Sequence, residues 1–229
     1  MPAALWVVMP VKNLADAKQR LAGVLNARER RALFRAMLED VLESVSRCDR
    51  LAGVAMVTRD REARALAARY GARVLEQDAD LGHTSASSFG ARVLAAEGAL
   101  GMLQLPADIP LVIPQDVDAV LDAHGDAPAV TLAPSHDELG SNAVACSPAD
   151  VLPLRFGDDS YVPHLRRARA LGIEPAVVRR RGLALDVDTP DDLRTFLAAP
   201  SATRAYDYLS GSGIAERVGV GDGLQPAPP

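Results

Sequence analysis

Residues 5–12 read LWVVMPVK, and this stretch decides the fold class of the 229-residue chain. Five consecutive apolar residues that end at Pro10 are typical of a strand buried on both faces of a parallel sheet. Lys12 follows this strand directly, and Lys18 lies six residues further on. Ligands of open α/β sheets collect at the carboxyl ends of the strands, so we expect both lysines at a ligand site.

Apolar runs and helical patterns alternate after this first strand. Asn26 precedes a pattern with Leu33, Met37 and Val41 at helical spacing, as a helix-capping residue would. The alternation predicts a Rossmann-like α/β domain with a mostly parallel mixed sheet flanked by helices and a small antiparallel β insertion. The expected strands are 5–9, 53–58, 73–76, 101–105, 129–133, 142–146, 176–179 and 183–187, and the expected helices are 27–47, 61–70, 85–97, 115–124, 160–171 and 191–198.

The composition is that of a globular protein, with 48% hydrophobic and 24% charged residues. The length fits one domain at residues 1–199, whereas the glycine- and proline-rich residues 200–229 predict a loosely attached C-terminal tail. A net charge of −5 argues against a nucleic acid partner, and no apolar run reaches the roughly 18 residues of a membrane span. Without a signal-peptide pattern or a disulfide framework, we expect a cytoplasmic monomer or homodimer with no membrane partner.

Only two of the 25 basic side chains are lysines, Lys12 and Lys18. Lysine provides a compact, rotatable charge where arginine provides a rigid fork, and the two are not interchangeable at a phosphate. In a chain that otherwise uses arginine, both lysines are therefore candidates for contacts with a phosphate group. The alternative is chance retention on a solvated helix face.

Three aspartates follow other predicted strands. Asp108 comes after the strand at 101–105, and Asp186 and Asp188 end a late strand, where a spacing of two lets both side chains point the same way. Separated carboxylates without a histidine or cysteine cluster suit Mg²⁺, which prefers oxygen ligands and shares them with phosphates. The alternatives are structural, because Asp108 could stabilise a turn and Asp188 could belong to the capped helix start at Thr189.

Residues 157–160 lead into the helix expected at 160–171. The free N–H groups and the positive dipole end of a helix favour an anion at such a place. The segment is therefore expected to bind an anionic group, with ordinary loop and capping chemistry as the alternative.

Six motifs occur in one order along the chain: MPVK at 9–12, AKQRL at 17–21, PADIPLV at 106–112, LGSNA at 139–143, FGDDSY at 156–161 and DVDTPDDL at 186–193. Together they resemble the 2-phospho-L-lactate guanylyltransferase family (CofC, with the bacterial phosphoenolpyruvate guanylyltransferase FbiD), which serves biosynthesis of coenzyme F420. The resemblance covers roughly residues 5–198. The last motif is shared by many GT-A-type nucleotidyltransferases, whereas the fourth and fifth are more discriminating.

The resemblance implies a GT-A-type nucleotidyltransferase that transfers GMP from GTP to a phosphorylated three-carbon acid and releases pyrophosphate, with Mg²⁺ as cofactor. The acid would be 2-phospho-L-lactate, phosphoenolpyruvate or 3-phosphoglycerate. The implied catalytic residues are Lys18, Asp108 and Asp188. The implied binding residues are Pro10, Lys12, Lys18, Gly82 and Thr84 for the nucleotide, Ser141, Asn142, Gly157 and Ser160 for the acid, and Asp108, Asp186 and Asp188 for the metal.

One segment departs from the family pattern. Residues 81–88 read LGHTSASS where a nucleotide contact resembling Gly-Leu-Asn-Ala-Ala is expected, so either His83 and the hydroxyls replace the missing amide or the base preference differs. Two other functions are compatible with these residues. One is nucleotidyl transfer to molybdopterin or a sugar phosphate, which the lack of glycine in residues 10–20 disfavours. The other is a non-catalytic nucleotide-binding module.

Overall fold

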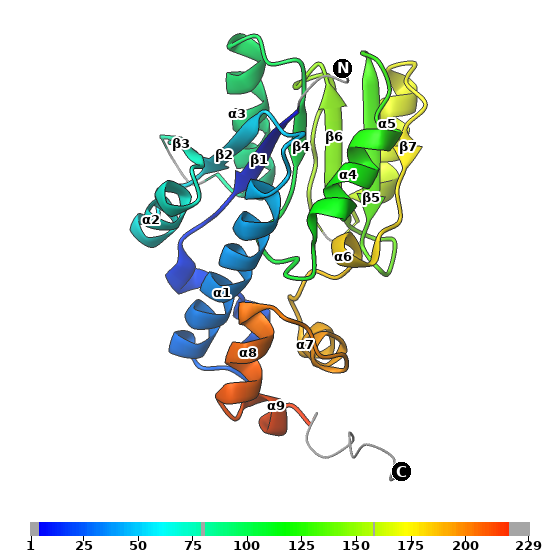
Figure 1. Ribbon diagram of the computed structural model, residues 1–229. Helices are drawn as coiled ribbons and strands as arrows, with labels where there is room; N and C mark the ends of the chain where they lie inside the picture. The colour runs from blue at the N-terminus through cyan, green and yellow to red at the C-terminus, as the bar shows by residue number, and fades with distance from the viewer. Residues whose placement is uncertain (1–4, 79–80, 158, 220–229) are drawn as a thin grey trace.

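The computed structural model describes residues 5–78, 81–157 and 159–219, and its centre is one mixed sheet with helices on both faces (Figure 1). Strands β3, β2, β1 and β4 are parallel neighbours. The antiparallel element lies inside the sheet, because β5 and β6 form a hairpin whose second strand also pairs with β4. The mostly parallel mixed sheet is thus confirmed. In sheet order its strands are β3 (Arg73–Leu75), β2 (Gly53–Val57), β1 (Trp6–Pro10), β4 (Met102–Gln104), β6 (Ser141–Ser147), β5 (Ala129–Pro134) and β7 (Ala176–Val177).

Two apolar cores join the sheet to its helices. One core includes α1, α2, α4 and α7, and the other includes α3 and α5. Val7 and Met9 of β1 belong to the first core and Val8 to the second, and all three are fully buried, as expected for a strand covered on both faces. The main helices are α1 (Ala27–Ser46), α2 (Arg61–Arg69), α3 (His83–Ala96), α4 (Pro114–Ala123), α5 (Tyr161–Ala170), α7 (Pro190–Leu197) and α8 (Arg204–Gly211). Across the described ranges, no helix is both long and apolar enough to cross a membrane.

Both helix starts that the sequence indicated are capped. Asn26 at α1 and Thr189 at α7 each form a reciprocal capping box with the third residue of the helix. At α7 that residue is Asp192, which also accepts the backbone N–H of Asp188 at 3.2 Å. The second box therefore fixes the backbone that carries Asp188.

The strand expected at 183–187 is absent. Leu183, Leu185 and Val187 are buried, but the chain forms the short helix α6 (Arg181–Ala184) and continues as extended backbone. Val187 donates its N–H to the carbonyl of Asp108 at 3.0 Å, and this single bond takes the place of a strand ladder. The prediction is wrong because one helical turn and one backbone contact bury the same alternating side chains that a strand would.

Residues 204–218 pack against α1, contrary to the loose attachment expected for them. Asp40 of α1 accepts the backbone N–H groups of Arg204 and Ala205 at 2.9 and 3.0 Å. Leu209 of α8 and Ile214 of α9 (Ile214–Arg217) are fully buried in the core that contains α1. The glycine-rich composition predicts a loose tail, but apolar residues at helical spacing supply a face that docks on the domain.

Replacing Leu209 with alanine tests this packing. Removing a fully buried leucine side chain costs about 2–5 kcal/mol of unfolding free energy. In urea titrations we expect this loss for Leu209→Ala and a change below about 0.5 kcal/mol for Leu171→Ala, at a position that is 50% exposed. Equal stability of the two variants would show that α8 adds nothing to the folded core.

Candidate functional site

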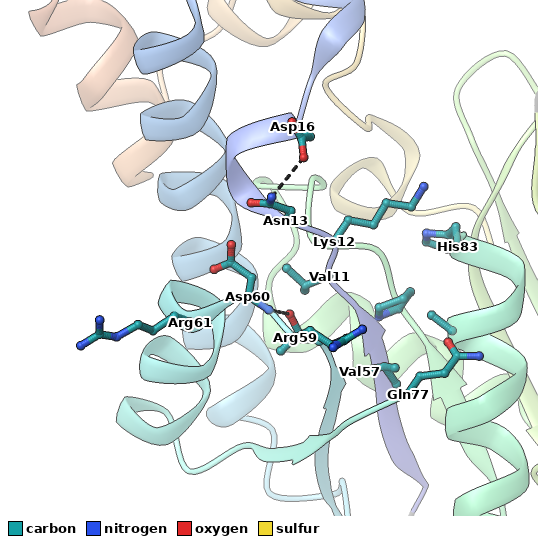
Figure 2. A pocket seen from close by; sticks show the side chains of 13 residues that line it. Val11, Lys12, Asn13, Asp16, Val57, Arg59, Asp60, Arg61, Gln77 and His83 are labelled. Atoms are coloured by element: carbon teal, nitrogen blue, oxygen red, sulfur yellow. Dashed lines mark hydrogen bonds between the residues drawn. The ribbon is translucent and has the colours of Figure 1, made fainter. Parts of the chain in front are cut away.

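Two adjoining cavities open at the carboxyl ends of β1, β2 and β4. The smaller cavity has a volume of about 520 Å³, and Pro10, Arg59 and Gln77 are among its lining residues (Figure 2). The larger cavity has a volume of about 840 Å³. Lys12 and His83 line both, and Figure 2 shows the Lys12 side chain extended toward His83 at the boundary. One extended ligand could therefore occupy both cavities.

The larger cavity brings together nearly all residues that the sequence singled out. They come from loops after β1 and β4, the start of α3, the start of β6, the segment before α5 and the segment before α7. Pro10 lies apart from them and lines the smaller cavity. The predicted residues in the larger cavity are Lys12, Lys18, Gly82, Thr84, Asp108, Ser141, Asn142, Gly157, Ser160, Asp186 and Asp188.

Lys18 is the buried centre of this cavity. Its Nζ lies 2.5 Å from Asp108 Oδ2 and 2.5 Å from Asp188 Oδ1, and its side chain is 3% exposed. Burial by itself would lower the pKa of Lys18, but the two carboxylates raise it above the ordinary lysine value, so the ammonium group stays charged. The backbone of Lys18 is left-handed, at φ 57°, which is uncommon for a residue with a side chain and is found more often at functional sites than elsewhere.

Asp186 and Asp188 differ in how readily they bind a proton. Burial, then the negative charge of Asp108, raises the pKa of Asp186 to about 6, although Asn142 donates a hydrogen bond to its Oδ1 at 3.0 Å. Burial would also raise the pKa of Asp188, but Lys18 outweighs it and lowers that pKa below the usual value. Carboxylates outnumber basic side chains in the lining of this cavity, where Asp108, Asp137, Asp186, Asp188 and Asp192 face Lys12, Lys18 and Arg20.

These aspartates fit a magnesium ion that arrives with phosphate oxygens. Within the described ranges, no group of three or more His, Cys, Asp or Glu side chains is arranged as a complete metal site. Asp108 Oδ1 is buried and has no hydrogen-bond partner among these residues, so it can accept a cation. Mg²⁺ is commonly held by one or two carboxylates plus substrate phosphates, and an incomplete carboxylate site suits it.

The other end of the larger cavity is lined by hydroxyl groups. Ser160 precedes α5, but its side chain does not cap that helix. Ser160 Oγ instead accepts the backbone N–H of Ser141 at 2.8 Å, which ties the start of α5 to the start of β6. Both serines are buried and line the cavity.

Residues 82–84 line the larger cavity between its aspartate-lined end and its hydroxyl-lined end. Gly82 precedes α3 with φ 90°, a left-handed value that favours glycine. Thr84 Oγ1 accepts the backbone N–H of Phe156 at 2.8 Å, so this hydroxyl supports the segment that leads to Gly157. The His83 ring packs edge-on against Phe156, with ring centroids 4.7 Å apart.

Two buried residues at this site, Gln104 and His164, were not predicted from the sequence. Gln104 of β4 lines the larger cavity, and its Oε1 has no partner in the part of the chain that the structure describes. A polar side chain inside the apolar stretch 102–105 was the available signal. His164 of α5 is fully buried and bonds to Ser141, and nothing in its local sequence marks it.

Solved structures share the fold of this chain. A nucleotidyl transferase from Methanothermobacter superimposes with a TM-score of 0.63 over 84% of this chain and 95% of its own, at 18% identity. A protein described as a nucleotide-diphospho-sugar transferase from Desulfovibrio desulfuricans superimposes with a TM-score of 0.77 over 94% of this chain and 98% of its own, also at 18% identity. The chain thus has the nucleotidyltransferase fold.

The sequence identifies the family within this class. Residues 5–221 match the family described as "Guanylyl transferase CofC like", and the chain belongs to this family of guanylyltransferases. The phosphoenolpyruvate guanylyltransferase of Rubrobacter xylanophilus is 36% identical over 83% of this chain and 92% of its own length. The 2-phospho-L-lactate guanylyltransferase of Methanothermobacter thermautotrophicus is 32% identical over 88% of each chain. The 3-phospho-D-glycerate guanylyltransferase of Phenylobacterium zucineum is 34% identical over 89% and 94%.

The raised pKa of Asp186 predicts a pH-dependent stability. The carboxyl binds its proton more readily in the folded protein, at about pH 6, than at its ordinary pKa of 3.8, so its contribution to stability is complete below about pH 4 and lost as the pH rises through 6. Asp186→Asn resembles the protonated form and keeps an acceptor for Asn142. We expect it to raise the unfolding free energy by about 1–3 kcal/mol near pH 7.5 and by almost nothing near pH 4.

Urea titrations at both pH values measure this effect. The control is Asp126→Asn, which changes an exposed aspartate remote from the cavity and should alter stability by less than about 0.5 kcal/mol at either pH. A gain for Asp186→Asn that does not depend on pH would contradict the assigned charge state.

Proposed function

We propose that this protein transfers GMP from GTP to a phosphorylated three-carbon acid and releases pyrophosphate, as a step in coenzyme F420 biosynthesis. The observation that carries the proposal is the larger cavity, in which the Lys18 ion pairs and the Ser141–Ser160 hydroxyls lie together. The first group suits a triphosphate with its metal, and the second suits a small anion. Membership of a guanylyltransferase family supports guanine as the base.

The donor nucleotide would span both cavities. The smaller cavity offers the Arg59 and Gln77 side chains beside apolar Val57, a mixture suited to a base and its ribose. Lys12, at the boundary, would meet the phosphates, and Lys18 would offset their charge in the larger cavity. Mg²⁺ held by Asp108 with Asp186 or Asp188 would add positive charge where the transferring phosphoryl group becomes more negative.

The acceptor acid would bind at Ser141, Asn142, Gly157 and Ser160. An oxygen of its phosphate would attack the α-phosphorus of GTP, and a new phosphorus–oxygen bond forms there. The bond from the α-phosphorus to the bridging oxygen breaks, and pyrophosphate leaves with that electron pair. The side chains of the protein position the two substrates and balance their charge.

The acid is proposed as a class. Relatives named for phosphoenolpyruvate, 2-phospho-L-lactate and 3-phospho-D-glycerate are 36%, 32% and 34% identical to this chain. These sequence identities differ too little to choose among acids that differ by a double bond or a hydroxyl position. All three acids therefore belong in the test.

Pyrophosphate release tests the proposal directly. Each acid is incubated with GTP, ATP or CTP in the presence of Mg²⁺, and we expect release with GTP and at least one acid. Chelation of the metal should abolish it, because the cavity carries excess negative charge that a triphosphate increases. If GTP releases no pyrophosphate with any of the three acids, the proposed activity is refuted.

Two substitutions test the buried ion pairs. Lys18→Ala and Asp188→Asn should each lower kcat/KM by about 10²–10³, as removal of one charge-stabilising group does in other enzymes, with the fold retained by circular dichroism. Asp191→Asn is the matched control, because Asp191 is three residues from Asp188 and its side chain is 91% exposed. Wild-type turnover in either cavity variant would refute the role of that residue.

A further inference from the structure

A closed hydrogen-bond network lies behind the hydroxyl-lined end of the larger cavity. His164 Nδ1 is 3.0 Å from Ser141 Oγ, and the Ser141 backbone N–H donates to Ser160 Oγ at 2.8 Å. His164 closes the network by donating its own backbone N–H to the Ser160 carbonyl at 3.0 Å. All three residues are buried, and the two serines line the cavity while His164 does not.

The second ring nitrogen determines the tautomer of His164. Arg155 donates its backbone N–H to His164 Nε2 at 3.0 Å, so Nε2 is an acceptor and carries no hydrogen. Burial, with smaller effects of Arg167 and Arg155, lowers the pKa of His164 to about 4, and the ring is therefore neutral at physiological pH. A neutral imidazole has one ring hydrogen, which must be on Nδ1. His164 thus donates to Ser141 Oγ.

This tautomer sets the direction of the Ser141 hydroxyl, and the Ser141 backbone N–H sets that of the Ser160 hydroxyl. Ser141 Oγ accepts from His164, and Ser160 Oγ accepts from the Ser141 backbone. Among the described residues, neither oxygen has another hydrogen-bond partner. Each hydroxyl therefore keeps its own hydrogen for a group in the cavity, and that group must be an acceptor. Phosphate and carboxylate oxygens are the strongest acceptors that a substrate could offer.

We propose that His164 is a positioning residue that holds the Ser141 hydroxyl as a hydrogen-bond donor to an anionic group of the acceptor acid, beside the Ser160 hydroxyl that the Ser141 backbone orients. The inference rests on the proposed function, because it assigns a role within the acid site. His164 does not touch the acid. It also fixes the Arg155 amide, next to Phe156, whose own amide is held by Thr84.

Three variants separate this role from a general contribution to the core. His164→Phe keeps a ring against Phe156, whose centroid is 5.2 Å away, and removes both nitrogen atoms. His164→Asn retains a side-chain N–H that can donate to Ser141 Oγ. The matched control is His124→Phe, because His124 also bonds two hydroxyls, Thr131 Oγ1 at 3.0 Å and Ser147 Oγ at 2.9 Å, which lie outside the larger cavity.

The readouts are KM for each substrate and calorimetric binding of phosphoenolpyruvate, or inorganic phosphate, without turnover. His164→Phe should raise the acid KM and Kd about tenfold, the loss expected for a hydrogen bond to a charged group, and leave the GTP KM within about twofold. His164→Asn should stay within about threefold of the wild type. His124→Phe should change neither KM. In ¹⁵N NMR spectra, His164 should show a protonated Nδ1 and an unprotonated Nε2.

The outcomes distinguish this inference from the proposed function. An unchanged acid KM in His164→Phe, or a protonated Nε2, overturns the role of His164 while guanylyl transfer stands. Weakened phosphoenolpyruvate binding in His164→Phe, without pyrophosphate release from any acid, supports the role of His164 in anion binding and refutes the proposed reaction. A wild-type protein that neither binds nor turns over any of these anions overturns both.

Discussion

The ion pairs of Lys18 with Asp108 and Asp188 are the interaction on which the site depends. A lysine that is 3% exposed remains charged only when carboxylates accompany it, and its partners lie 90 and 170 residues away along the chain. The loop after β4 supplies Asp108, and the capping box of Thr189 fixes the backbone of Asp188. The fold therefore has to hold three distant segments around one ammonium group, with Lys18 itself in a left-handed conformation.

The proposed donor and acceptor ends of the site share their supporting contacts. Phe156 lies between the rings of His83 and His164, and its backbone N–H bonds to Thr84. Burial lowers the pKa of His83 to about 4, so this shared wall is neutral at physiological pH. In the proposed function, Lys12 and Lys18 would supply positive charge for the phosphates, together with a metal ion at the aspartates. The reacting groups of both substrates would then lie within the larger cavity.

The sequence could predict those elements that residues close together along the chain determine. The apolar run of β1 and the capping residue Asn26 determine their elements within a few residues, and the structure confirms both. The prediction of a strand at 183–187 failed because an alternation of apolar and polar residues does not reveal whether a neighbouring strand is present to pair with the backbone. The role of His164 could not be predicted from the sequence, because it depends on a hydrogen bond to Ser141, 23 residues away. The catalytic and binding roles carried over from the family resemblance stay predictions, although the fold gathers nearly all of those residues at one cavity.

The most direct test of this account is a crystal structure with Mg²⁺ and a GTP analogue whose α–β bridge cannot be cleaved. We expect the guanine in the smaller cavity near Arg59 and Gln77. We expect the α-phosphate in the larger cavity beside Lys18, with the metal ion on Asp108 and a second aspartate. A nucleotide bound elsewhere, such as at the separate cavity beside Arg179–Arg181, would contradict it.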